Sequence, residues 1–431
     1  MNPFVAIAFL ASGVQNTPTT LTLDQAIAIA DRNAFANLIA QSNVALARQK
    51  INEAAGEMRP TLNVGGTYTR FDQPSTANFN GNRFTVQPVD EKSLTAKLGF
   101  VVDLSGSLLK LLQASKANFY ASQDTLQATK NSIKQTVRTD YYAILRAQAQ
   151  VAVGQETVTS NQELVKTTQQ QMTAGTLAKV DVLNAQAQLS QAQGALISDQ
   201  DQLDLAKQTL NNVLARPIQT PLEVVDVTNT PVLNATADQL TATAQSQRPE
   251  VLALQQTVRE LQLIKRATSA GTAPTLNLSI NGVQNIGSTG FGGRLQTASG
   301  VASLNWPIYD GGVTRARVNE AEQNVIQAQI QLNQSELSVS LQVRTSYTNY
   351  QNALSRQNVA DAQVAAAKEA LRLAVLKRDQ GEGILLEVLN AETAYATAQT
   401  SQVSAHYDVL QAIADLQLAY GSDQLPLINS K

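Results

Sequence analysis

The order of apolar and polar positions between the glycines and prolines is mostly helical. The longest such stretch runs from Leu108 to about Thr173 and contains no proline and a single glycine, Gly154. Gln, Ala, Leu and Lys dominate it, and all four favour helix. The pattern predicts helices over residues 23–57, 108–173, 179–215, 238–269, 313–379 and 384–420. In the third of these an apolar residue returns every seven positions, which predicts a coiled-coil seam at Val182, Leu189, Leu196, Leu203 and Leu210.

Four shorter segments alternate between apolar and small polar residues with period two, which is the pattern of a strand with two different faces. They are TLNVGGTYTRF from Thr61, SLTAKLGFVVD from Ser93, TLNLSINGVQNI from Thr275 and TASGVASLNWPI from Thr297. Each is about ten residues long, enough for a tilted strand to cross a bilayer. An apolar face and a polar face suit a membrane barrel with a wet lumen. Residues 72–92 and 287–295 are expected to be water-exposed loops.

Four strands are too few to close a barrel, and an open sheet edge in lipid leaves backbone groups unpaired at several kcal/mol each. We therefore expect other copies of the chain to complete the sheet, and three copies supply twelve strands. The long helices are rich in Gln, Asn, Ser and Thr where a bundle core needs Leu. They fit a tube of helices around water. The predicted fold class is mainly α, with a trimeric α-barrel and a 12-stranded membrane β-barrel to which each chain contributes four strands.

The two halves of the chain repeat each other. Gly175 and Gly381 are separated by 381 − 175 = 206 positions, and Asp181 and Glu387 by 387 − 181 = 206. In both copies the acid is followed by the same four residues, Val-Leu-Asn-Ala. Such a long duplication predicts two structural repeats. The expected organisation is a signal peptide at 1–16, a first repeat at 20–217, a linker at 218–237, a second repeat at 238–421 and a C-terminal tail at 422–431.

Composition narrows the function. The chain has 431 residues, a net charge of −2, no cysteine and one histidine, His406. The balanced charge gives no electrostatic argument for nucleic acid, and the missing cysteines exclude disulfides and thiolate metal sites. We expect no catalytic residues, no metal and no cofactor. The apolar start, MNPFVAIAFLASG, is typical of a secretory signal.

Several motifs together resemble the TolC-type outer-membrane efflux proteins, over about residues 20–420. They are PTLN after Arg59 and again after Ala273, QRPEV from Gln247, WPIYDGG from Trp306, and the two turns of the form G-x5-[DE]-V-L-N-A. In place of the Asn-Pro that often occurs early in the family, this chain has RNAFANL. That departure concerns the local geometry of the first helix.

The resemblance implies a homotrimeric channel in the cell outer membrane that extends into the periplasm, contacts outer-membrane lipid, and performs no catalysis. It implies a periplasmic adaptor (membrane fusion) protein and an inner-membrane efflux pump or ABC transporter as partners, as in tripartite efflux or type I secretion. The glycine turns then form the adaptor-contact tip: Gly175, Thr176, Leu177, Gly381, Glu382 and Gly383. The acids beyond them belong to a periplasmic gate with Asp181, Glu387, Asn390 and Arg378. Arg378 or Lys377 is expected to pair with Asp181 of a neighbouring helix. The family often has a second acid where Asn390 stands.

Two other interpretations remain open at this stage. The chain is alternatively a periplasmic coiled-coil adaptor or scaffold, which needs no membrane strands. Asp181 and Glu387 are alternatively first-turn acids that favour the positive end of a helix dipole and line no pore.

Overall fold

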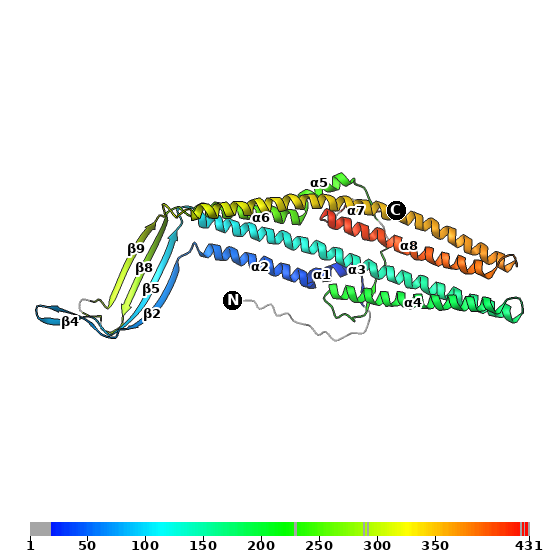
Figure 1. The fold of residues 1–431 in the computed structure, drawn as a ribbon, viewed down its shortest axis with the longest axis horizontal. Helices are drawn as coiled ribbons and strands as arrows, with labels where there is room; N and C mark the ends of the chain where they lie inside the picture. Colours follow the sequence, from blue (N-terminus) through cyan, green and yellow to red (C-terminus); the bar gives the residue numbers. More distant parts are fainter. Residues whose placement is uncertain are drawn as a thin grey trace. The chain divides into compact units, whose positions relative to one another are not determined.

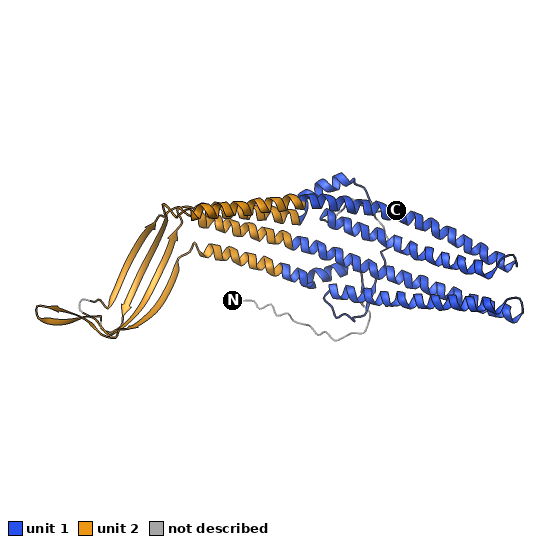
Figure 2. Ribbon diagram, viewed as in Figure 1, with its two compact units in different colours: residues 1–40, 126–249, 336–431 blue, residues 41–125, 250–335 orange. Residues whose placement is uncertain are grey.

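The structure of the chain is a computed structural model that describes residues 19–227, 231–287, 289–290, 293–422, 425 and 427–429 (Figure 1). It divides into two compact units (Figure 2). Unit 1 comprises residues 1–40, 126–249 and 336–431, and unit 2 comprises residues 41–125 and 250–335. The expected signal peptide, 1–16, lies outside the described residues.

Long helices dominate the described chain. The helices are α1 (Leu23–Asn33), α2 (Phe35–Gly56), α3 (Ser107–Thr173), α4 (Lys179–Val213), α5 (Ala237–Gln247), α6 (Pro249–Thr268), α7 (Val313–Asp379) and α8 (Leu385–Tyr420). The strands are β1 (Thr19–Leu21), β2 (Thr61–Arg70), β3 (Ser75–Phe79), β4 (Asn82–Gln87), β5 (Asp90–Val102), β6 (Leu222–Val224), β7 (Pro231–Leu233), β8 (Thr275–Asn285), β9 (Gln296–Asn305) and β10 (Leu427–Asn429). Across the described ranges, no helix is both long and apolar enough to cross a membrane.

The four longest predicted helices are confirmed closely. Both α3 and α7 are 67 residues long, and α4 and α8 have 35 and 36 residues. The seam of α4 faces inward: Val182 and Leu210 are buried, and the three leucines between them are half-buried.

Two predicted helices are each divided in two. Arg248 separates α5 from α6 with an extended backbone, φ −65° and ψ 128°, because a following proline disfavours helical geometry at the preceding residue. Ala34 separates α1 from α2 with φ −58° and ψ 126°, although no proline follows it. There the side chain of Asn37 donates to the carbonyl of Asp31 and so holds the bend across the break. The segment RNAFANL, which has no proline, therefore contains a break between two helices.

The four predicted long strands form one antiparallel sheet in unit 2, in the order β2-β5-β8-β9. The register places apolar residues beside apolar residues and polar residues beside polar residues across the four strands. One row joins Leu62, Leu98, Ile280 and Gly300, and the next row joins Asn63, Lys97, Asn281 and Ser299. The sheet therefore has one apolar and one polar face, as predicted. Along β9 every residue is exposed, and Leu62 of β2 is 69% exposed. The described part of the chain leaves both faces largely uncovered.

The segment 72–92 was expected to be a loop, and this expectation is wrong. It contains the hairpin β3–β4, and β5 already begins at Asp90. Asn80 and Gly81 form the turn with φ of 50° and 79°. Positive φ at both central positions is the geometry of a tight two-residue hairpin turn, for which Asn-Gly is the favoured pair.

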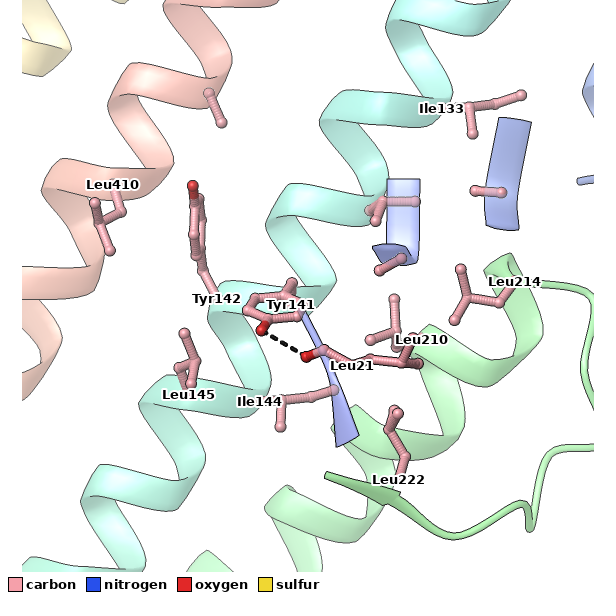
Figure 3. Packing of buried hydrophobic residues seen from close by; sticks show 14 of the residues in the cluster. Leu21, Ile133, Tyr141, Tyr142, Ile144, Leu145, Leu210, Leu214, Leu222 and Leu410 are labelled. Atoms are coloured by element: carbon pink, nitrogen blue, oxygen red, sulfur yellow. Dashed lines mark hydrogen bonds between the residues drawn. The ribbon is translucent and has the colours of Figure 1, made fainter. Parts of the chain in front are cut away.

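The main core of unit 1 surrounds Tyr141 of α3 (Figure 3). Leu210 of α4, Leu214 directly after α4 and Leu410 of α8 pack around it, together with alanines of α1. The Tyr141 hydroxyl lies 2.9 Å from the carbonyl oxygen of Leu21 and 2.6 Å from that of Val225, and the Val225 amide donates to it. This side chain thereby ties the parallel pair β1–β6 to the long helix.

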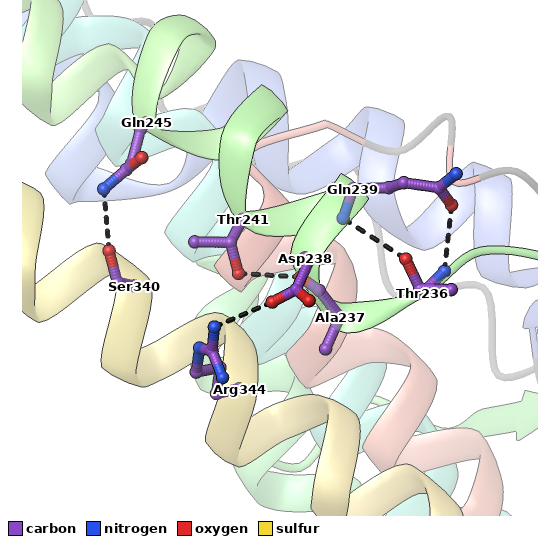
Figure 4. A network of polar contacts seen from close by, with 8 residues as sticks. All are labelled: Thr236, Ala237, Asp238, Gln239, Thr241, Gln245, Ser340 and Arg344. Atoms are coloured by element: carbon purple, nitrogen blue, oxygen red, sulfur yellow. Dashed lines mark hydrogen bonds and ion pairs between the residues drawn. The ribbon is translucent and has the colours of Figure 1, made fainter.

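Polar contacts fasten α5 to α7 in the same unit (Figure 4). Thr236 and Gln239 form a capping box at the start of α5, which pairs backbone amides that a helix end leaves open. Asp238 accepts a hydrogen bond from Arg344 of α7 at 2.7 Å, and Gln245 donates to Ser340 at 2.8 Å. These polar pairs join the exposed sides of the two helices.

Candidate functional site

The two glycine turns of unit 1 have the same backbone construction. Gly175 and Gly381 take left-handed conformations with φ of 77° and 78°. The Thr176 amide donates to the Gln171 carbonyl at 3.0 Å, and the Glu382 amide donates to the Lys377 carbonyl at 2.9 Å. Each is a Schellman ending, in which a left-handed residue closes a helix and its neighbour bonds back by five residues. Glycine suits that residue because it has no Cβ to strain.

The remaining turn residues differ between the copies. Thr176 and Glu382 are exposed, like the two glycines before them. Leu177 is half-buried and packs against Leu385 and its neighbours, whereas the equivalent position of the second turn is Gly383. A Cβ on Gly383 would lie 3.1 Å from both the Arg378 nitrogen and the Lys377 Cβ. The second turn is therefore the tighter of the two.

The expected gate acids lie in the first turns of α4 and α8. Asp181 is half-exposed, and Glu387 and Asn390 are exposed. Neither helix has a side-chain cap at its start, since the N-cap residues are Ala178 and Ile384. Both acids therefore face solvent at the positive end of a helix. The dipole interpretation accounts for their place in one chain equally well, so their role at a gate stays a prediction.

Arg378 does not contact Asp181 within the described chain. Its guanidinium bonds to the neighbouring Asp379, with Nη2 at 2.8 Å and Nε at 3.1 Å from Oδ1. Its side chain is only 16% exposed. The expected pairing of Arg378 or Lys377 with an Asp181 stays a prediction for the assembled channel.

The two helical hairpins pack together near these turns. Leu164 of α3 and Leu177 of the first turn join an apolar cluster with Leu385, Val388 and Leu389 of α8. Further along, the Gln188 side chain of α4 donates to the Thr393 hydroxyl at 2.8 Å. The helices that carry the gate residues are thus held together by apolar packing and by a hydrogen bond.

Glu392 is a buried acid that the sequence patterns did not single out. Its residue surface is 6% exposed, and its Oε1 atom has no hydrogen-bond partner. Burial raises the pKa of the Glu392 carboxyl, while a hydrogen bond from Ser160 and the charge of Arg378 oppose that rise. It follows Leu385, Val388 and Leu389 on one helix face. An acid at the spacing of an apolar stripe is the signal that identifies it.

Comparison with known proteins gives consistent matches over most of the chain. The family described as "Outer membrane efflux protein" matches residues 28–216 and 240–422. The outer membrane efflux protein BepC of Brucella suis biovar 1 (strain 1330) is 25% identical over 320 residues, covering 73% of this chain and 69% of BepC. The outer membrane protein TolC of Escherichia coli (strain K12) is 25% identical over 392 residues, covering 87% of this chain and 77% of TolC. A solved structure of CusC superposes with a TM-score of 0.81 at 18% identity and covers 96% of each chain.

Proposed function

The chain belongs to the outer membrane efflux protein family, and on that premise we propose that three copies form one channel, which is gated and docked at its glycine turns. The protein is an outer-membrane efflux or secretion channel that extends into the periplasm, and it is not an enzyme. The predicted family, the mainly α fold with long helices and four antiparallel strands per chain, and the predicted role as an outer-membrane efflux or secretion channel are thereby confirmed. The alternative of a periplasmic coiled-coil adaptor is set aside.

The observation that carries the trimer is the sheet of unit 2. It is apolar on one face and polar on the other, and β2 and β9 have no strand partner on their outer edges in the described chain. In a bilayer those edges must be paired, because lipid offers the backbone no hydrogen bonds. Three sheets joined edge to edge make a closed barrel of twelve strands. The apolar row through Leu62, Leu98 and Ile280 would then face lipid.

The gate is proposed at the first turns of α4 and α8. Asp181, Glu387 and Asn390 each occur once per chain, so threefold symmetry repeats each around the channel axis. Rings of acids attract cations and repel one another when they approach. Arg378, which lies beside Asp379 within the chain, is proposed as the counter-charge that a neighbouring copy's Asp181 meets in the closed state.

The adaptor contact is proposed at the turns themselves, through Gly175, Thr176, Leu177, Gly381, Glu382 and Gly383. Glycine there leaves the backbone accessible: a Cβ on Gly175 or Gly381 would meet nothing within 4 Å. A periplasmic adaptor and an inner-membrane efflux pump or ABC transporter are the proposed partners. Support comes from the family, whose members serve efflux and secretion.

Single-channel recording in planar bilayers tests the channel and its gate together. We expect the purified protein to give a small, cation-selective conductance that divalent or trivalent cations block from the periplasmic side. Glu387→Gln should raise the half-blocking cation concentration severalfold, because the ring loses its charge. Asp181→Ala should raise the conductance by loosening the closure.

The matched control is Glu163→Gln on α3, which removes one exposed acid. Glu163 pairs only loosely with Lys166, at 3.6 Å, and such surface pairs contribute little. This variant should conduct and be blocked like the unmodified protein. No conductance from folded protein would contradict the channel itself. Unchanged selectivity and block in Glu387→Gln would instead favour the helix-dipole interpretation of that acid.

A further inference from the structure

A cavity of about 330 Å³ lies between α3, α4 and α8 in unit 1, and neither the gate nor the turns use it. It is bounded by residues 153–161 of α3, 188–199 of α4 and 392–401 of α8. Its volume is that of a small-molecule site. We call it the α3–α4–α8 cavity.

Two buried side chains in its lining have acceptor oxygens without a partner. They are Oε1 of Glu392 and Oδ1 of Asn161, and the two residues are 6% and 1% exposed. The Asn161 amide nitrogen donates to the Thr157 carbonyl at 2.9 Å, which fixes the oxygen on the other side. Buried acceptors without a donor cost free energy, so an occupant that donates hydrogen bonds is favoured here.

The lining has few donors to offer these atoms. Each of its hydroxyl groups donates to a backbone carbonyl four residues earlier on its own helix, and so presents only lone pairs to the cavity. These are the hydroxyls of Thr157, Thr393, Thr397, Thr400 and Ser401. The donors that remain belong to uncharged amides, those of Asn161, Gln188 and Gln191. The lining therefore offers more acceptors than donors, which favours a ligand that donates hydrogen bonds.

The charge of the lining has the same sign throughout. Glu392 and Asp199 are both acids, and no lysine or arginine is among the lining residues. Arg378, which acts on Glu392 from outside the cavity, already bonds to Asp379. Two acids in a partly buried space without a basic partner favour a cation. The described residues contain no group of three or more His, Cys, Asp or Glu side chains able to hold a metal ion, so an organic cation fits better than a metal.

The two acids are spaced along the cavity. Asp199 Oδ2 is 3.2 Å from where a Cβ on Gly154 would lie, and Glu392 bonds to Ser160. Gly154 and Ser160 are six residues apart on α3, which is about 9 Å of helix rise. Between them the lining is small and partly apolar, with Ala192, Ala195 and Ala396. A short hydrocarbon chain with an ammonium at each end matches this order of charge, methyl groups and charge.

We propose that the α3–α4–α8 cavity binds a linear aliphatic diamine, with one ammonium at Glu392 and Asn161 and the other at Asp199. Each ammonium donates hydrogen bonds of about 2.8 Å to carboxylate and amide oxygens. The four to five methylenes between them lie along the alanines. Bound there, the ligand links the three helices and stabilises their packing.

Isothermal titration calorimetry on the detergent-solubilised full-length protein tests this with cadaverine as the probe. We expect one cadaverine per chain at physiological ionic strength, where surface charge is screened. The monoamine n-pentylamine has the same carbon chain and one charge fewer, and should bind at least about tenfold more weakly. Glu392→Gln and Asp199→Asn should each weaken cadaverine binding to a similar degree. Both changes preserve side-chain shape, and a higher melting temperature with cadaverine gives a second readout.

Asp201→Asn is the matched control, since it removes an exposed acid two residues from Asp199 on the same helix. It should bind cadaverine as the unmodified protein does. Equal binding of pentylamine, or unchanged binding in Glu392→Gln and Asp199→Asn, would overturn the proposal. Mg²⁺ binding that depends on the same two acids would also overturn it, because the cavity would then be a metal site. The absence of any binding heat with cadaverine would overturn it as well, and water would then be the occupant. The titration needs neither bilayer nor pump, so its failure would leave the channel proposal intact.

Discussion

Asp140 shows how a single carboxyl makes the stability of this protein depend on pH. It lies in α3, its Oδ2 atom is buried without a hydrogen-bond partner, and burial raises its pKa from 3.8 to about 6. The folded chain then holds this proton more tightly than the unfolded chain. The stabilisation is complete below pH 3.8 and is lost as the pH rises through 6. At neutral pH the buried charge destabilises the fold.

We therefore predict that Asp140→Asn raises the melting temperature at pH 8 by a few degrees and leaves it nearly unchanged at pH 4. The amide has the shape of the carboxyl and carries no charge at either pH. Differential scanning calorimetry of the solubilised protein at the two pH values measures this difference. Asp201→Asn, an exposed acid on α4, should shift both temperatures equally. A shift for Asp140→Asn as large at pH 4 as at pH 8 would contradict the prediction.

The positions of individual residues were predictable where a repeat marked them. Asp181 and Glu387 stood out because the same turn occurs twice in the sequence, and the structure places each in the first turn of a helix. Glu392 was missed because its burial depends on α3, a helix more than two hundred residues away in sequence. Its hydrogen bond to Ser160 and its empty Oε1 are properties of that packing. Helical spacing shows that Glu392 lies on the same face of α8 as the apolar residues before it. Only the packing of α8 against α3 shows which side chains contact Glu392.

At the scale of elements, periodicity predicted which segments are helices and which are strands. The wrong predictions concern helix breaks and a hairpin, which depend on a few neighbouring residues. The break at Arg248 was readable from the proline after it. The break at Ala34 was not, since it depends on the Asn37 side chain reaching the Asp31 carbonyl. The β3–β4 hairpin was readable from Asn80-Gly81. It was missed because its flanking segments are polar and short.

At the scale of elements, the glycine turns allow a test of the proposed adaptor contact. Leucine at both Gly175 and Gly381 should abolish efflux while trimers still reach the outer membrane. A left-handed side chain costs about 1–2 kcal/mol per position, but a Cβ there meets nothing within 4 Å, so the fold should survive. The added bulk would obstruct the adaptor instead. Growth in the presence of an exported compound and the trimer content of outer-membrane fractions are the two measurements.

Asparagine at both glycines is the control for backbone strain. It tolerates the left-handed conformation better than leucine and adds a small polar side chain. This variant should retain most of the efflux. Normal efflux in the leucine variant would remove the turns from the adaptor contact. Loss of trimers would show that the glycines serve folding.

For the whole molecule, the sequence predicted four strands with two faces but not their order. The order β2-β5-β8-β9 pairs a strand of the first repeat with one of the second, at β5 and β8. Periodicity does not contain that pairing, because each strand presents the same alternation to either neighbour. What periodicity did restrict is the register, since a slip of one residue would move Leu98 and Ile280 to the polar face. The outer edges of β2 and β9 are left for other copies.

Cysteine pairs test that closure directly, because the chain has no cysteine of its own. β2 and β9 are separated by β5 and β8, so they lie about 14 Å apart across the sheet. A disulfide needs Cα atoms closer than about 7 Å. Any bond between a cysteine on β2 and one on β9 must therefore join two chains. We expect Val64→Cys, combined in turn with cysteine at Ala298, Gly300, Ala302 and Leu304, to cross-link in at least one combination.

The size of the cross-linked product decides between a ring and an open array. Each chain of a closed ring gives one β2 edge and one β9 edge, so oxidation should produce dimers and then trimers on denaturing gels, with nothing larger. Each single-cysteine variant should give no trimer, since a lone thiol joins two chains at most. Products longer than trimers would indicate an open array of sheets. Failure of all four combinations, in protein that still conducts, would show that β2 and β9 are not the joined edges. A ladder that stops at three is the result expected if twelve strands close the barrel, because the third bond uses the last free edge.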